Sequence, residues 1–278
     1  MIRIENLQKS YGAARAVDGV DLTVNRGELF AFLGPNGAGK TTTIRILTGL
    51  TKIGSGRVTI GGCDIAQNPR AAKRQCGLVA QHINLDSELS VRENLDIHGR
   101  LFAMPAQERR RRIDELLEYV EMTNRADHLV KQLSGGLKRR LMIARALMHQ
   151  PRIIFLDEPT VGLDPAIRRR IWALIKRVRQ DDATIFLTTH YIEEAEFLAD
   201  RVAFLDQGKI VALDQPQNLM AKLGLWAIDQ ISGENMETHY FQSRDEAAQF
   251  SAGHDSAFTL RRVNLEDAFL SLTGKKVS

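Results

Sequence analysis

The sequence predicts an α/β fold with a mainly parallel sheet, and three observations support this expectation. Short apolar runs alternate along the chain with segments whose apolar residues recur at helical spacing. Residues 29–33 and 153–156 are apolar at every position, as in buried strands. The first of these runs stops at Gly34, where a glycine-rich stretch leads into a helical segment. Crossover helices join such strands in parallel, and ligands then bind at the carboxyl ends of the strands.

The N-terminal part of the chain provides the first strands of this core. The strand at residues 29–33 is followed by a helix over residues 41–47. Residues 57–62 and 76–81 have the composition of two further short strands. We therefore expect three strands and one helix before the pattern changes.

A helical insertion is expected over about residues 88–150. The stretch from 91 to 148 keeps a helical pattern, in which Leu137, Leu141, Ala144 and Met148 share one face. The densest basic run, residues 109–112, lies in this insertion. We interpret it as the solvated face of an amphipathic helix, with contact to phosphate or lipid head groups as the alternative.

The second half of the chain resumes the alternation. After the strand at 153–156, Asp164 and Pro165 begin a helix, because an N-cap residue followed by proline is a common helix start. Residues 184–189 form another strand. Beyond Gly224 the alternation weakens, so we assign residues 1–224 to the main domain and residues 225–278 to a small α+β unit ending in a helix.

The composition is that of an ordinary globular protein. The chain has 278 residues, of which 44% are apolar and 26% charged. No run of roughly 18 apolar residues exists to span a bilayer, and the start lacks the apolar stretch of a signal peptide, so we expect a cytoplasmic protein. Cys63 and Cys76 are in no CxxC pair and are expected to be reduced thiols. The net charge of +4 alone would allow nucleic acid or an acidic membrane as partner.

A phosphate-binding loop is the first motif that carries chemistry. Residues 34–41 fit the pattern G-x-x-x-x-G-K-[ST] and stand between a predicted strand and a helix. Glycines let backbone N–H groups surround phosphate oxygens, and the helix directs its positive end at the same charge. Lys40 would reach the β and γ phosphates, and the Thr41 hydroxyl would hold Mg²⁺. A glycine-rich turn that only joins strand to helix is the alternative.

A pair of carboxylates forms the second motif. The apolar strand at 153–156 delivers Asp157 and Glu158 at its end, where burial of unpaired charge would be costly. Mg²⁺ would supply the partner for Asp157, directly or through water. Glu158 would orient and polarise the attacking water, because phosphoryl transfer depends mainly on positioning. Without the phosphate loop, the pair could equally be a solvated strand end.

At this point the sequence resembles the ATP-binding cassette (ABC) family. Five residues ahead of an amphipathic helix look like the signature motif of that family: Leu133, Ser134, Gly135, Gly136 and Leu137. The resemblance covers about residues 1–224, with the motifs in the family's order. It implies a P-loop NTPase core with an inserted helical subdomain. It also implies that the signature binds the γ-phosphate held by an opposite subunit, to which Ser134 and Gly136 can present donors.

Other positions match the family one at a time. Gln81 resembles the Q-loop glutamine, which contacts Mg²⁺ and water and senses the transmembrane partner. His190 resembles the switch histidine that steadies the water, and Asp164 resembles the D-loop aspartate, although it also suits a helix N-cap. Tyr11 lies where the family stacks an aromatic ring on adenine. The resemblance thus implies a catalytic set of Lys40, Gln81, Glu158 and His190, Mg²⁺ ligands Thr41, Gln81 and Asp157, and ATP contacts from Tyr11, Gly34, Pro35, Asn36, Gly37, Ala38, Gly39, Lys40, Thr41 and Thr42.

The signature departs from the family's pattern at Leu137, where many members carry glutamine. The following residues 138–140, with residues 189–195 and 265–270, look similar to the drug and lipid exporter branch. The remaining histidines share no metal-ligand spacing, so no zinc site is expected: His82, His98, His128, His149, His239 and His254.

The resemblance implies an ATPase subunit that powers transport through a separate membrane permease, and export of a drug, lipid or other hydrophobic compound is the expected direction. The protein would sit peripherally on the cytoplasmic face of the membrane. Two copies would sandwich ATP in a head-to-tail arrangement. The alternative is an ATPase of the same superfamily that acts on ribosomes or nucleic acid. Such proteins usually have two cassettes or a long coiled coil, and this chain has neither, so no nucleic acid partner is expected.

Overall fold

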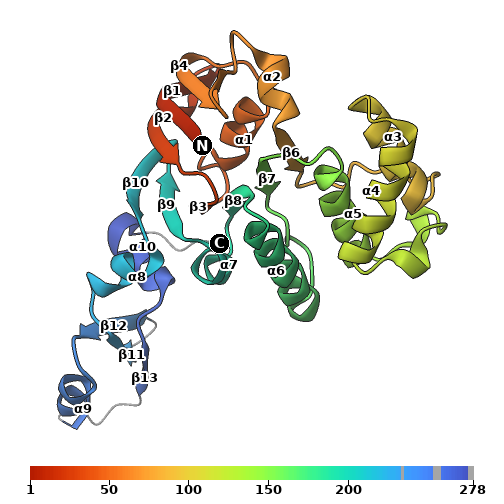
Figure 1. Ribbon diagram of the computed structural model, residues 1–278. Coiled ribbons are helices and arrows are strands. Elements are labelled where there is room, and N and C mark those ends of the chain that lie inside the picture. The colour runs from red at the N-terminus through yellow and green to blue at the C-terminus, as the bar shows by residue number, and fades with distance from the viewer. Residues whose placement is uncertain (233–234, 253–257, 275–278) are drawn as a thin grey trace.

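The computed structural model describes residues 1–232, 235–252 and 258–274, and a six-stranded sheet forms its centre (Figure 1). The strand order is β10-β9-β3-β8-β7-β6. All neighbouring pairs are parallel except β9 and β10, which form a hairpin. The predicted α/β class with a mainly parallel sheet is confirmed. The strands are β3 (Leu29–Leu33), β6 (Cys76–Val79), β7 (Ile153–Asp157), β8 (Thr184–Thr189), β9 (Arg201–Asp206) and β10 (Lys209–Asp214).

A second sheet is antiparallel, with the order β2-β1-β4-β5. The expected strand at 57–62 is β4 (Ser55–Ile60), which belongs to this sheet, and Gly61 and Gly62 turn the chain into β5 (Cys63–Asp64). The sequence did not predict β1 (Ile2–Tyr11) or β2 (Ala14–Val24). Their register shifts at several places, so the apolar alternation that would reveal a strand is interrupted.

The central sheet is covered on both faces. Leu29, Ala31 and Leu33 pack toward a core shared with helices of the second half of the chain. Phe30 and Phe32 pack toward a core shared with α1 and the antiparallel sheet. The helices that surround the sheet are α1 (Lys40–Leu47), α2 (Pro69–Arg74), α6 (Pro165–Gln180), α7 (Ile192–Leu198) and α8 (Pro216–Ala221).

The inserted segment is helical, as its spacing predicts. It contains α3 (Val91–Leu101), α4 (Ala106–Tyr119) and α5 (Gly135–Leu147), which form a group to one side of the sheet in Figure 1. Two short 3₁₀ turns, Thr123–Arg125 and Val130–Gln132, connect α4 to α5. Ser90 and Glu93 form a capping box at the start of α3. These helices bury an apolar core of their own.

The C-terminal part extends from the opposite side of the sheet in Figure 1. It contains β11 (Trp226–Ser232), β12 (Asn235–Phe241), α9 (Arg244–Ala252), β13 (Phe258–Arg262) and α10 (Leu265–Thr273). The strands form an antiparallel sheet in the order β12-β11-β13. Helix α10 returns to the main core, where the ring of Phe269 meets that of Phe204 at 5.1 Å. The division at residues 224 and 225 stays a prediction, and residues 233–234, 253–257 with His254, and 275–278 lie outside the described residues.

In the part of the chain that the structure describes, no helix combines the length and the apolar composition needed to cross a bilayer.

Candidate active site

The phosphate-binding loop is shaped by two glycines that no other residue could replace without a clash. A Cβ atom on Gly34 would lie 2.2 Å from the backbone oxygen of Leu205, and one on Gly39 would lie 2.1 Å from that of Ala16. Gly39 also has a positive φ of 106°, which disfavours residues with side chains. The loop is supported from outside, because the N–H of Gly208 donates to the backbone oxygen of Ala38 at 3.0 Å.

Helix α1 begins directly after this loop. Its N-cap residue is Gly39, which has no side chain that could bond to the first N–H groups of the helix. Those donors and the positive end of the helix macrodipole are therefore available to an anion. The predicted ATP contacts from Gly34 to Thr42 thus belong to one continuous loop and helix start. Their contact with nucleotide stays a prediction.

Lys40 lies over this loop and is 4% exposed. Its Nζ donates to the backbone oxygens of Gly34 at 2.7 Å and Pro35 at 3.0 Å, and lies 3.4 Å from Oε1 of Glu158. Burial lowers the pKa of Lys40, and the nearby carboxylates of Glu158 and Asp157 act in the opposite direction. An ammonium group held in this way can turn its three donors toward phosphate oxygens.

Asp157 ends the buried strand β7 and is 5% exposed. Its Oδ1 accepts hydrogen bonds from Oγ1 of Thr188 at 2.6 Å and from Oγ1 of Thr41 at 3.2 Å. Burial raises the pKa of Asp157, while these two hydroxyl groups lower it. A buried carboxylate beside the Thr41 hydroxyl is the set of hard oxygen ligands that suits Mg²⁺, so the residues fit the predicted metal.

Side chains from several elements of the site surround the Glu158 carboxylate. The N–H of Glu158 donates to the backbone oxygen of Thr188 at 3.0 Å, and its φ of 46° is unusual for a residue with a side chain. Its Oε2 accepts a 2.9 Å hydrogen bond from Nε2 of Gln81. Nδ1 of His190 lies 3.2 Å from the same oxygen, but without the direction of a hydrogen bond. The structure therefore brings Lys40, Gln81, Asp157, Glu158 and His190 together.

The sequence suggested that Gln81 ends a strand, and this expectation is wrong. Strand β6 stops at Val79, and Gln81 lies in the bend that follows. This difference matters because a residue beyond the strand is held by side chains of other elements and not by the sheet ladder. Its contact with Mg²⁺ stays a prediction.

The predicted signature residues lie in another part of the fold, at the start of α5 in the helical group (Figure 1). The Oγ of Ser134 caps α5 by accepting a 3.4 Å hydrogen bond from the N–H of Leu137. A Cβ on Gly136 would lie 2.6 Å from Cγ2 of Ile167 in α6, so glycine permits this close approach. Asp164 caps α6 through a 3.0 Å hydrogen bond from the N–H of Ile167. The N-cap interpretation of Asp164 is thus observed, and its D-loop role stays a prediction.

Tyr11 ends β1 and is 52% exposed, so its ring is accessible. The ammonium of Lys9 lies 5.3 Å from the ring centroid. An accessible aromatic face can stack on a nucleotide base, and adenine stacking at Tyr11 stays a prediction.

Sequence reasoning missed two residues of the site. Thr188 donates a hydrogen bond to Asp157. The one feature of the sequence that could have indicated this role is the position of a hydroxyl residue two places before His190. Arg139 donates to the backbone oxygens of Ala80 at 2.8 Å and Gln81 at 3.1 Å. The sequence indicated Arg139 only as part of residues 138–140, which look similar to the exporter branch, because its partners are about 60 residues away in the sequence.

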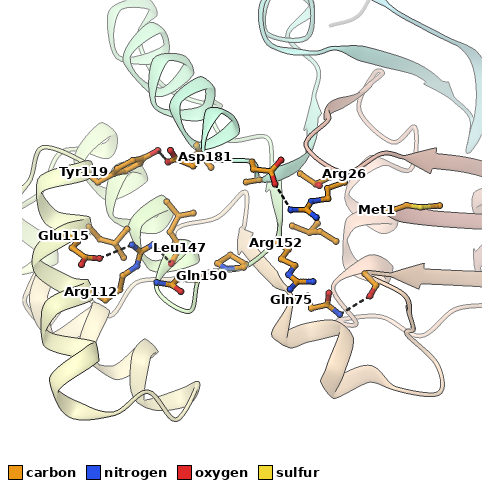
Figure 2. A pocket seen from close by; sticks show the side chains of 18 residues that line it. Met1, Arg26, Gln75, Arg112, Glu115, Tyr119, Leu147, Gln150, Arg152 and Asp181 are labelled. Carbon is orange, nitrogen blue, oxygen red and sulfur yellow. Dashed lines mark hydrogen bonds and ion pairs between the residues drawn. The ribbon is translucent and has the colours of Figure 1, made fainter.

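A cavity of about 620 Å³ lies outside this site (Figure 2). It separates α4 from the amino ends of β7 and β8, so it lies at the opposite edge of the sheet from Asp157. Figure 2 shows that several polar groups around it are paired: Tyr119 donates to Asp181, Arg112 to Glu115 and Arg26 to Asp182. The cavity is therefore not the place where the predicted nucleotide residues meet.

Comparisons with known proteins agree with the motifs. The family model described as ABC transporter matches residues 17–161. The Nod factor export ATP-binding protein I of Paraburkholderia xenovorans (strain LB400) is 38% identical, and the match covers 99% of this chain and 98% of that protein. The linearmycin resistance ATP-binding protein LnrL of Bacillus subtilis (strain 168) is 41% identical over 84% of this chain and 75% of that protein.

Solved structures give the same result. The ATP-binding subunit of an ABC transporter superposes with a TM-score of 0.72 at 28% identity, covering 80% of this chain and 92% of that one. A dimeric ATP-binding cassette in a post-hydrolysis state, bound to ADP and Pi, has a TM-score of 0.70 at 32% identity, covering 77% and 98%. With the phosphate loop, the carboxylate pair and these matches in agreement, we conclude that the chain belongs to the ABC transporter family as an ATP-binding subunit.

Proposed function

We propose that this chain binds and hydrolyses Mg-ATP to power export of a hydrophobic compound through a separate membrane permease. One observation carries the catalytic part of this proposal. The buried Glu158 carboxylate is contacted by Gln81 and Lys40 and has His190 at 3.2 Å, directly beside Asp157. Such a carboxylate next to a phosphate loop suits activation of a water molecule at the γ-phosphate.

Each residue then has a separate task. Lys40 and the loop N–H groups bind the phosphates, and Thr41 and Asp157 hold Mg²⁺, which when bound neutralises phosphate charge. Glu158 accepts a proton from the attacking water. Gln81 and His190 keep Glu158 and the water in position. These assignments extend the geometry described above to the bound state.

The position of the signature supports a head-to-tail dimer. Ser134 and Gly136 begin α5 in the inserted helical group, whereas Lys40 begins α1 in the core. A second copy, rotated by a two-fold axis, would place its signature over the phosphate loop of the first. Two ATP molecules would then lie between the copies, and hydrolysis would remove the phosphate that joins them.

The descriptions of the relatives support export as the direction of transport. They include proteins described as Nod factor export and as linearmycin and daunorubicin resistance ATP-binding proteins. A subunit of this kind acts on a permease, so the protein would lie at the cytoplasmic face of the membrane, with the main domain over residues 1–224 and an accessory unit over 225–278. An ATPase acting on ribosomes or nucleic acid is the alternative that the experiment separates.

The first test compares Mg-ATP hydrolysis by the wild type, Glu158→Gln and Glu193→Gln. Glu193 is an exposed carboxylate in the first turn of α7 and is the matched control. Glu158→Gln should lose at least about 100-fold in hydrolysis rate while still binding ATP, because it cannot accept the proton. Hydrolysis at the wild-type rate would remove Glu158 from the mechanism.

The second test identifies the partner. Tagged Glu158→Gln protein would be purified from detergent-solubilised membranes in Mg-ATP, and its companions identified by mass spectrometry. A polytopic membrane protein at near-equal stoichiometry supports the transporter proposal. Ribosomal or DNA-bound proteins in its place would favour the alternative.

A further inference from the structure

The loop that carries Gln81 is attached to helix α5 more than to its own sheet. Nη1 of Arg139 donates to the backbone oxygen of Ala80 at 2.8 Å, and Nη2 donates to that of Gln81 at 3.1 Å. One turn and a half further along α5, Nη1 of Arg145 donates to the backbone oxygen of Asn84 at 2.6 Å. Arg145 also bonds to the side-chain oxygen of Asn84. Two arginines of one helix thus hold both ends of residues 80–84.

The placement of Arg139 is energetically unusual. It is 4% exposed, and among the described residues no carboxylate forms an ion pair with its guanidinium, whose oxygen partners are neutral carbonyls. Burial lowers the pKa of Arg139, and the more distant Glu194 and Asp157 only partly offset this effect. A buried charge without a paired carboxylate is costly, so packing alone does not account for an arginine here.

The planar fork of arginine suits this task. Its two Nη groups reach two successive carbonyls at once and so fix the direction of the two peptide groups that flank Gln81. The side chain of Gln81 leaves the backbone between these two peptides and donates to Oε2 of Glu158 at 2.9 Å. A change in the peptide direction would therefore move the amide away from Glu158.

We propose that Arg139, assisted by Arg145, is a positioning residue for ATP hydrolysis, because it holds the Gln81 backbone on α5 so that the Gln81 amide meets Glu158. Helix α5 begins directly after Ser134, five residues before Arg139. A displacement of Ser134 would thus move Gln81 as well, because one short stretch of rigid helix joins Ser134 to Arg139. This inference rests on the proposed hydrolysis at Glu158.

The test is a double-mutant cycle on ATP hydrolysis by the full-length chain. Arg139→Met removes the donors at similar length, and Gln81→Ala removes the group through which Arg139 acts. We expect Arg139→Met to lower kcat about tenfold, with KM for ATP changed less than about twofold, because the phosphate loop is untouched. In the Gln81→Ala background, Arg139→Met should cause no further loss.

Two further variants separate the alternatives. Arg140→Met is the matched control, since the next residue of the same helix bonds to Val120 and Glu121 and not to the loop, so kcat should stay unchanged. Arg139→Lys keeps the charge but lacks the planar fork of two nitrogens that orients both carbonyls, and it should not restore kcat. If Arg139→Met does not fold, Arg139→Lys and Arg145→Met are measured in the same cycle.

The inference is overturned if kcat of Arg139→Met equals that of the wild type. It is also overturned if the losses of Arg139→Met and Gln81→Ala multiply in the double variant, because the two residues would then act independently. A wild-type kcat in Arg139→Lys would overturn it as well, because the charge without the planar fork would then be sufficient. A wild-type chain without any Mg-ATP hydrolysis would instead contradict the proposed function, so the two failures are distinguishable.

Discussion

Thr188 and Asp157 are joined by a 2.6 Å hydrogen bond in which Oγ1 of Thr188 donates to Oδ1 of Asp157. The two residues lie side by side at the carboxyl ends of neighbouring parallel strands, since Asp157 pairs with Thr188 in the register of β7 and β8. The hydroxyl fixes one oxygen of the carboxylate that is proposed to hold Mg²⁺. Residues that orient a metal ligand in this way influence metal affinity without touching the metal.

Thr188→Val should lower the affinity of the site for Mg²⁺. Valine keeps the shape of threonine but cannot donate to Asp157, so the carboxylate is less well oriented. We expect the Mg²⁺ concentration for half-maximal ATP hydrolysis to rise about tenfold. A magnesium titration of the hydrolysis rate measures this. Thr184→Val is the control, because Thr184 lies at the other end of β8 and its hydroxyl accepts from the N–H of Gly27 and does not contact Asp157. An equal rise in both variants would contradict the role of Thr188.

Gly39→Ala should impair nucleotide binding. The added Cβ would lie 2.1 Å from the backbone oxygen of Ala16, and φ is 106°, so the loop must move. Backbone strain of about 1–3 kcal/mol corresponds to ATP binding weakened about 5- to 150-fold, which calorimetric titration would measure. Gly62→Ala is the control, since Gly62 also has a positive φ but no atom near the added Cβ. It should lower stability by about 1 kcal/mol and leave ATP binding unchanged.

The central sheet could be predicted from the sequence because its strands are buried on both faces. Residues 153–156 are apolar throughout, and β7 (Ile153–Asp157) is buried at every position. The strand β1 could not be recognised. Between Ile4 and Leu7 its register shifts and Asn6 has a positive φ of 43°, so the apolar residues are spaced by two and then by three. A strand detected by alternation is lost at such a bulge.

The parts of the site that could be predicted are those whose functional residues are consecutive in the sequence. The phosphate loop and the Asp157 and Glu158 pair are of this kind. Thr188 and Arg139 act through contacts with segments that are distant in sequence, and a threonine in a strand or an arginine in a helix has many ordinary uses. Only the packing of β7 beside β8, and of α5 beside β6, reveals their partners.

Acid should destabilise the helical group through His98. Burial, with Arg145 and His149 nearby, lowers the pKa of His98 from 6.5 to about 4, and its Nε2 has no hydrogen-bond partner among the residues that the structure describes. Between these values the unfolded chain binds the proton more strongly than the folded one, so stability falls as pH decreases from 6.5 toward 4. We expect a loss of about 1–2 kcal/mol between pH 7 and pH 5.

Denaturant unfolding at the two pH values measures this loss. His98→Phe keeps an aromatic ring beside Phe102 and cannot be protonated, so it should reduce the pH dependence. An unchanged pH dependence in His98→Phe would show that other groups cause the acid sensitivity.

Arg261 should be required for the C-terminal unit but not for hydrolysis. Its guanidinium bonds to Asp229 of β11 at 2.6 Å and to Asp267 of α10 at 2.6 Å, and so joins the small sheet to the helix that packs on the main core. Arg261→Met would leave the buried Asp267 without its charged partner, and we expect this unit to lose about 2–3 kcal/mol of stability. Arg262→Met, which only removes a cation over the Trp226 ring, should cost less than about 1 kcal/mol. Hydrogen exchange in β11 and α10 measures both losses. Mg-ATP hydrolysis should remain within about twofold of the wild type, because the carboxylate partners of Arg261 are Asp229 and Asp267 and not residues around Glu158. A parallel fall in hydrolysis would instead make the C-terminal unit part of the control of ATP turnover.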